Sequence, residues 1–340
     1  MAILINAYCT VRHLPPLEFP HRVHGQRDRR DAELAEHLRG FVGYVLRDED
    51  ELTKRRYHIV RHIERVRHHL SLDVADEALD AFASWAERAN AIAFLPDGTV
   101  RDPTGAVLLY PGATEPDAGA VMPYPADSRR RKDANQRRLR DSGFPVLESL
   151  PPVVGEDEIE PQPAAEVARR AMALAVVAIR GESLASDSGL SVAEIRNRLP
   201  LGFDALSPNE RLFIEAASPT QQQVLDATWR YEALSALQWA LALVDALPFP
   251  STICDVPRTA RIMLDADPAR FAESTRLRPA ADLLDALDLH YRLHWVIREA
   301  QQRSRDLPGA VEAGVVAERH YALNWLLLAD AGWDDVDTPT

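Results

Sequence analysis

Helical periodicity in the second half of the chain constrains its fold more than any other feature. From Ala164 onward, apolar residues recur three and four positions apart in one segment after another, which is the spacing that places them on one face of a helix. Ser207 followed by Pro208 is typical of a helix start, and Pro248 predicts a helix end. The pattern predicts an all-α domain, with its longest helices over residues 165–179, 219–246, 279–303 and 310–330.

The first hundred residues show a different pattern. Residues 2–9 are rich in β-branched and aromatic side chains, which predicts a strand. Asp31 and Thr53 each precede an amphipathic segment and are typical helix N-caps. Short apolar runs on either side of Asp97-Gly98 predict a β-hairpin.

These signals predict three parts. Residues 1–110 form a small α+β domain, residues 111–127 form a linker rich in Pro, Gly, Ala and Asp, and residues 128–340 form a larger all-α helical domain. The predicted fold class of the whole chain is therefore α+β, with the small α+β domain first and the helical domain second.

The charge of the chain is unevenly distributed. The net charge is −13, but residues 1–150 hold 22 basic and 23 acidic side chains, so nearly all of the excess, −12, lies in the remainder. An acidic half of this kind argues against binding to nucleic acid or to an anionic membrane surface. The longest apolar stretch, residues 233–247, contains Gln238 and Asp245 and is too short for a membrane span.

The two cysteines indicate a reducing compartment. Cys9 and Cys254 lie far apart and form neither a CxxC pair nor a disulfide framework. The N-terminus lacks the positive region of a signal peptide. We therefore expect a cytoplasmic protein. Cys254, at a predicted helix boundary, is better explained by packing than as a nucleophile.

Charged and polar residues interrupt the apolar faces of the predicted helices. A buried charge is costly unless it is paired, so these residues form either a structural polar network or a site. If they form a structural network, they pair with one another in buried ion pairs. If they form a site, Glu232, Glu318 and His320 are candidates for acid–base catalysis, as in a hydrolase. Trp229, Arg230, Arg298 and Arg319 are the accompanying candidates for binding a ligand or a partner.

A metal site is a further alternative. His290 and His294 are four residues apart on one predicted helix, so both rings can reach one ion. The chain has no HExxH sequence, however, and a pair of histidines at this spacing is also typical of a structural network. We expect no cofactor.

A basic helix is predicted in the first domain, after Thr53. Its arginines could dock an acidic partner or a phosphate-rich ligand, although charged helix faces are more often simply solvated. The candidate partner-binding residues are Arg55, Arg56, Arg61 and Arg65. No GxSxG, P-loop or GxGxxG sequence is present.

Several phrases of the second half occur in a characteristic order. They are Leu206-Ser207-Pro208-Asn209-Glu210, Trp229-Arg230-Tyr231-Glu232, Glu318-Arg319-His320-Tyr321 and Trp333-Asp334-Asp335. In this order they resemble the bacterial family catalogued as domain of unknown function 4272, over roughly residues 125–340. The resemblance implies no catalytic residues. It implies an immunity or partner-binding role, because some members of the family are thought to lie near toxin-delivery genes.

The leading hypothesis from the sequence is a non-enzymatic cytoplasmic protein that binds another protein. An acidic surface is suited to masking a basic partner, as a toxin-neutralising (immunity) protein would do, because complementary potentials steer association. The alternatives are a hydrolase and a metal- or ligand-binding protein, in either case with a site in the helical domain.

Overall fold

The computed structural model describes residues 2–47, 52–110, 117–186, 189–267, 270–307, 309–328 and 332–338. The chain forms two compact units. The first comprises Met1–Arg129 and Val154–Ile159, and the second comprises Arg130–Val153 and Glu160–Thr340. The first unit thus continues beyond residue 110 and includes residues 117–127 of the predicted linker. Residues 111–116 of that linker lie outside the described ranges.

The first unit is built on a six-stranded sheet with the order β2-β3-β1-β4-β5-β6, in which all neighbouring strands are antiparallel. Its elements are β1 (Ala2–Cys9), β2 (His21–Asp28), α1 (Ala32–Val45), α2 (Lys54–Arg65), β3 (His68–Ala75), η1 (Asp76–Ala78), α3 (Leu79–Arg88), β4 (Ala91–Phe94), β5 (Val100–Arg101), β6 (Val107–Leu109) and the short η2 (Glu156–Glu158).

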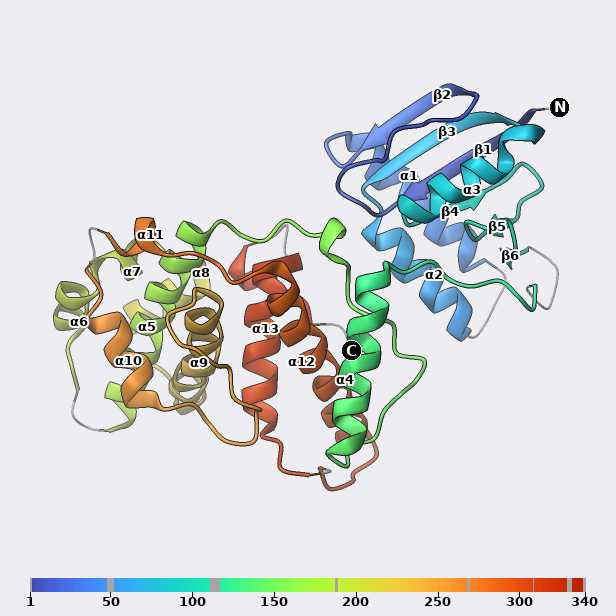
Figure 1. Ribbon diagram of the computed structural model, residues 1–340. Coiled ribbons are helices and arrows are strands. Elements are labelled where there is room, and N and C mark those ends of the chain that lie inside the picture. Colours follow the sequence, from blue (N-terminus) through green and yellow to red (C-terminus); the bar gives the residue numbers. More distant parts are fainter. Residues whose placement is uncertain are drawn as a thin grey trace. The chain divides into compact units, whose positions relative to one another are not determined.

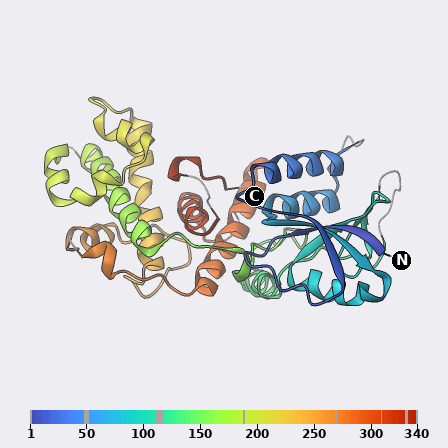
Figure 2. The ribbon, with the colours of Figure 1, turned by 90° about the horizontal axis from the view of Figure 1, so that it is seen from above.

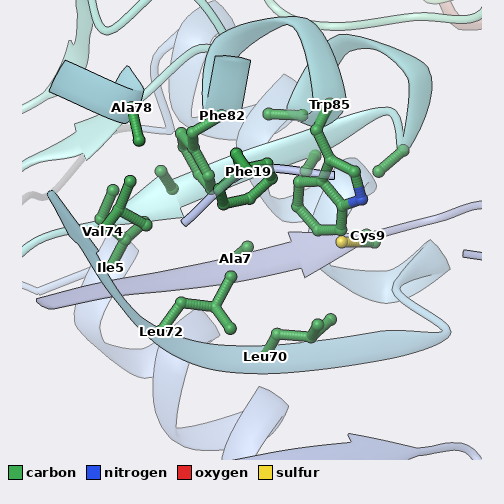
Figure 3. Packing of buried hydrophobic residues seen from close by; sticks show 14 of the residues in the cluster. Ile5, Ala7, Cys9, Phe19, Leu70, Leu72, Val74, Ala78, Phe82 and Trp85 are labelled. Carbon is green, nitrogen blue, oxygen red and sulfur yellow. The ribbon is translucent and has the colours of Figure 1, made fainter. Parts of the chain in front are cut away.

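Alternation along β1 gives the sheet two apolar faces. Ile5, Ala7 and Cys9 point to the face that α3 covers, where Phe82 and Trp85 pack on them (Figure 3). Tyr8 points to the opposite face and packs with residues of α1 and α2. Figure 2 shows α1 and α2, in blue, on one side of the sheet and α3, in teal, on the other.

Strand β2 was not predicted from the sequence. It lies at the edge of the sheet, pairs only with β3, and most of its residues are exposed. Its sequence, His-Arg-Val-His-Gly-Gln-Arg-Asp, therefore lacks the alternation of apolar and polar residues that marks a half-buried strand. A bulge between Val23 and Gly25 interrupts the pairing, as is common at sheet edges.

The second unit is helical in its described part, as predicted. Its helices are α4 (Ala126–Asp141, which begins in the first unit), α5 (Ala164–Ala185), α6 (Val192–Arg198), α7 (Pro200–Asp204), α8 (Pro208–Glu215), α9 (Gln221–Ala240), α10 (Val256–Leu264), α11 (Phe271–Ser274), α12 (Ala280–Gln302) and α13 (Ala313–Leu328). Figure 1 labels them all. Within the described ranges, no helix is long and apolar enough to cross a membrane.

Helix α5 is central to this unit. From Val167 to Ile179 almost every side chain is buried, and the helix packs mainly against α9 and α7. Helix α9 also packs against α13, which in turn packs against α12. Helix α9 ends at Ala240 rather than at residue 246, because Ala242 adopts a left-handed conformation (φ 57°) and the N–H of Leu243 donates to the carbonyl of Gln238.

Candidate functional site

Glu232 and Arg319 form a buried ion pair between α9 and α13. The Glu232 carboxylate accepts hydrogen bonds from Nε and Nη2 of Arg319 at 3.1 and 2.9 Å, and both side chains are only 2% exposed. The other carboxylate oxygen accepts from the backbone N–H of Cys254 at 2.5 Å, and Arg319 also donates to the carbonyl of Pro248 at 2.7 Å. The pair therefore joins two helices and also holds the middle and the end of the segment between α9 and α10.

A second pair joins the same two helices. Nη1 of Arg230 donates to both carboxylate oxygens of Glu318, each at 2.9 Å. Burial raises the pKa of Glu318, and the charge of Arg230 opposes that rise. Trp229, the neighbour of Arg230, packs over Gly314, where an added Cβ would lie 2.6 Å from the indole ring. Both residues thus hold α9 against α13.

Three histidines lie on α12 and α13. Nδ1 of His294 and Nδ1 of His320 are 2.9 Å apart, so one donates and the other accepts, and at least one ring is neutral. Nδ1 of His290 is bonded to the carbonyl of Ala286, 2.7 Å away. Burial lowers the pKa of all three, to about 4 for His290, and the exposed Arg298 lowers that of His294 further.

These contacts place the two candidate metal-binding histidines in separate hydrogen bonds. His290 is bonded within its own helix and His294 to His320. In the part of the chain that the structure describes, no group of three or more His, Cys, Asp or Glu side chains is arranged to hold a metal ion.

Two further buried ion pairs, one within α12 and one between α5 and α8, contribute to contacts between helices of the second unit. Arg292 donates to both oxygens of Asp288 at 2.8 Å, and Asn135 of α4 donates to the same carboxylate at 3.0 Å. Arg170 of α5 donates to Glu210 of α8, both side chains being less than 10% exposed. The charged residues that interrupt the apolar helix faces are thus partners in contacts between helices.

The catalytic candidates lie in this network. Glu232 and Glu318 are held by arginines, and His320 is 2% exposed and bonded to His294. Cys254 donates its thiol to the carbonyl of Tyr231, and burial, reinforced by Glu232, raises the pKa of that thiol to about 12. These positions favour a structural role for all four side chains.

The arginines of the basic helix α2 form hydrogen bonds and ion pairs within the first unit. Arg55 donates to the carbonyl of Ala120 at 3.1 Å, and Arg56 donates to that of Val45. Arg65 pairs with the buried Glu158 at 3.3 Å. Arg61, which is more exposed, pairs with Glu64 at 2.7 Å. The four candidates for partner binding therefore all contact groups of the first unit.

A pocket of about 230 Å³ lies among α5, α6, α9 and α10 of the second unit. One part of its wall is polar: the hydroxyl of Tyr231 donates to a carboxylate oxygen of Glu182 at 2.6 Å. Arg198 is the second charged residue of the wall. The remaining side chains are hydroxyl-bearing or apolar: Ser183, Ser186, Ile179, Leu190, Ile195, Leu199, Ala260 and Leu264.

Gly181 brings α5 close to α9 beside this pocket. A Cβ at Gly181 would lie 2.8 Å from Cβ of Ala227 and 3.0 Å from the backbone nitrogen of Thr228. Only glycine permits this approach, and the next residue, Glu182, meets Tyr231 one helical turn after Ala227. A glycine inside a long apolar helical pattern was the available sequence signal, but the partner helix cannot be identified from it.

These features define an α+β protein with a helical unit whose interior is crossed by ion pairs. The sequence model of a family described as "Domain of unknown function (DUF4272)" matches residues 131–336, which is more than half of the chain. The chain therefore belongs to this family, as its sequence motifs indicated. No match was found among the curated proteins, and none among the solved structures.

Proposed function

We propose that the protein acts in the cytoplasm by binding another protein that has a basic surface, in the way that a toxin-neutralising protein masks its target. The observation that carries this proposal is where the negative charge lies. Residues 151–340 account for −12 of the net charge of −13. This excess of negative charge can bind a partner only if it lies on exposed side chains.

The buried ion pairs support an acidic surface. Arg170, Arg292 and Arg319 are almost fully buried, and each is matched by one buried carboxylate. These interior pairs sum to zero charge, so the excess of carboxylates is carried by more exposed side chains. Among them are Asp204, Glu215 and Asp226, which are exposed and form no ion pair with a described residue. A surface of this kind attracts a basic partner and speeds its association.

The test is recovery of a stoichiometric partner from the native cell, followed by binding measurements with purified components. We expect a partner with an excess of Lys and Arg, and a Kd that weakens steeply as salt rises, because screening acts on exposed charges. The triple variant Asp204→Asn, Glu215→Gln, Asp226→Asn should bind more weakly. Failure to recover a stoichiometric partner, or recovery of one whose binding is indifferent to salt, would contradict the proposal.

The first unit offers a matched control. Glu36, Asp80 and Glu87 are also exposed carboxylates on helices, and the variant Glu36→Gln, Asp80→Asn, Glu87→Gln removes the same number of charges. Equal weakening by both triple variants would indicate a general effect of net charge rather than an interface on the helical unit. If the partner is toxic, co-production of the chain should restore growth, and the second-unit variant should restore it less.

A further inference from the structure

We propose that the pocket among α5, α6, α9 and α10 binds a small aliphatic zwitterion, with its ammonium group at Glu182 and its carboxylate at Arg198. This inference is independent of the proposed protein-binding role. It rests on the charges, the aliphatic side chains and the size of the pocket.

The Glu182 carboxylate is a ready acceptor for an ammonium group. One of its oxygens is fixed by the hydroxyl of the buried Tyr231, at 2.6 Å. No Lys, Arg or His among the described residues forms an ion pair with Glu182. A carboxylate held in place by one donor, beside apolar walls, gains most from a charged donor on its remaining oxygen.

Arg198 provides the opposite charge at the mouth. It lies at the end of α6 and is exposed, and its charge acts on Glu194, one turn earlier on the same helix, although the described residues include no salt bridge between the two. It borders both this pocket and an adjoining open hollow, which Arg261 and Leu264 also line. Because Glu182 and Arg198 are the only charged side chains among the described residues of the pocket wall, the complementary ligand carries one positive and one negative group.

The rest of the wall determines the body of the ligand. Ile179, Ile195, Leu199 and Leu264 present aliphatic surface to the pocket. Given that a water molecule takes up about 30 Å³ in the liquid, a volume of about 230 Å³ holds roughly eight non-hydrogen atoms. An apolar amino acid such as leucine has about this size and carries one positive and one negative group.

The experiment is calorimetric titration of the full chain near neutral pH with L-leucine, L-isoleucine, L-valine and 6-aminohexanoate. Two analogues of leucine separate its charged groups: 3-methylbutylamine lacks the carboxylate, and 4-methylpentanoate lacks the amine. We expect saturable binding of at least one zwitterion with a stoichiometry of one, and binding at least about tenfold weaker for each singly charged analogue of leucine if leucine is bound. Absence of saturable binding across the four zwitterions would overturn the proposal.

Three variants localise the binding. Glu182→Gln keeps the size of the side chain, whereas Arg198→Gln replaces the charged group by a shorter polar one; each should weaken binding about tenfold or more. Tyr231→Phe removes only the donor that positions Glu182 and should weaken binding less. Glu273→Gln, on α11 and outside the pocket wall, is the control and should bind as the parent does. Binding that is unchanged in Glu182→Gln would assign the ligand to another place.

Discussion

Glu232 on α9 and Arg319 on α13 are joined by two hydrogen bonds, at 3.1 and 2.9 Å, and each side chain is only 2% exposed to solvent. The loop residues Pro248 and Cys254 complete the hydrogen bonding of the pair. A charge pair with so many of its hydrogen-bonding groups satisfied is stable in the interior, but either charge alone is not.

The first prediction follows from this asymmetry. Replacing Arg319 by Met should lower the free energy of unfolding by about 3–5 kcal/mol, because it leaves the Glu232 carboxylate buried without its cation. The double variant Glu232→Leu, Arg319→Met should lose less than the sum of the two single changes. Denaturant titrations of the four proteins measure the coupling between the two residues.

A surface pair supplies the control for this cycle. Glu166 and Arg169 form an ion pair on α5 in which both side chains are about half exposed. Glu166→Ala should change the free energy of unfolding by about 1 kcal/mol or less. If Arg319→Met were as mild as Glu166→Ala, the buried pair would not stabilise the contact between α9 and α13 as described.

Loss of stability in mild acid is the second prediction. Burial lowers the pKa of His290 to about 4 and lowers those of His294 and His320. The unfolded chain takes up these protons near pH 6.5, whereas the folded chain resists them, so stability is complete above about pH 6.5 and falls as the pH drops toward 4. Each histidine contributes a slope of at most about 1.4 kcal/mol per pH unit.

The variant His320→Gln isolates this effect, because glutamine can still bond to His294 but does not titrate. The difference in unfolding free energy between pH 7.5 and pH 5 should shrink by about 1–2 kcal/mol. Comparison with the parent is necessary because the raised pKa of Glu318 acts in the opposite direction, and because His62 and His69 of the first unit have lowered pKa values of their own. If the unfolding free energy of His320→Gln depended on pH as that of the parent does, His320 would not contribute to the loss of stability in acid.

Much of the fold was predictable because local signals and burial agree. The N-caps Thr53 and Ser207 each accept a hydrogen bond from the backbone three residues later, and β1 alternates between two buried faces. Strand β2 was missed because an exposed edge strand has no apolar face to mark it. Its pairing with β3 depends on partners that are forty or more residues away.

The contacts of the candidate site could be predicted from the sequence only in part. Glu232 and Arg319 were recognised as charges that must be paired, but helical periodicity gives no helix-to-helix register, so the pairing itself was not predictable. Glu182 and Tyr231 were missed as candidates. An exposed glutamate and a buried tyrosine are ordinary in helices, and only the close approach at Gly181 makes them part of one pocket wall.

The third prediction concerns that close approach. Gly181→Ala should destabilise the helical unit by about 1–3 kcal/mol, because the new Cβ would overlap Ala227 and the backbone of Thr228, which cannot give way as a flexible side chain would. The double variant Gly181→Ala, Ala227→Gly should recover part of the loss. At Gly40 of α1 an added Cβ would meet no atom within 4 Å beyond the adjacent backbone of its own helix, so Gly40→Ala should instead stabilise that helix by about 0.5–1 kcal/mol. Thermal unfolding should show a loss of stability in Gly181→Ala and a gain in Gly40→Ala.

The fourth prediction concerns the two thiols. Burial raises the pKa of Cys9, which is fully buried under Trp85, and raises that of Cys254 to about 12. Because the thiolate is the reactive form, both cysteines of the folded chain should react slowly with an aromatic disulfide reagent at pH 7.5. Cys254 is only half-buried and should react before Cys9. In denaturant both should react at the rate of a free thiol, and Cys254→Ser identifies the faster phase. Rapid reaction of Cys254 in the folded chain would show that its thiolate is stabilised, and would return it to consideration as a nucleophile.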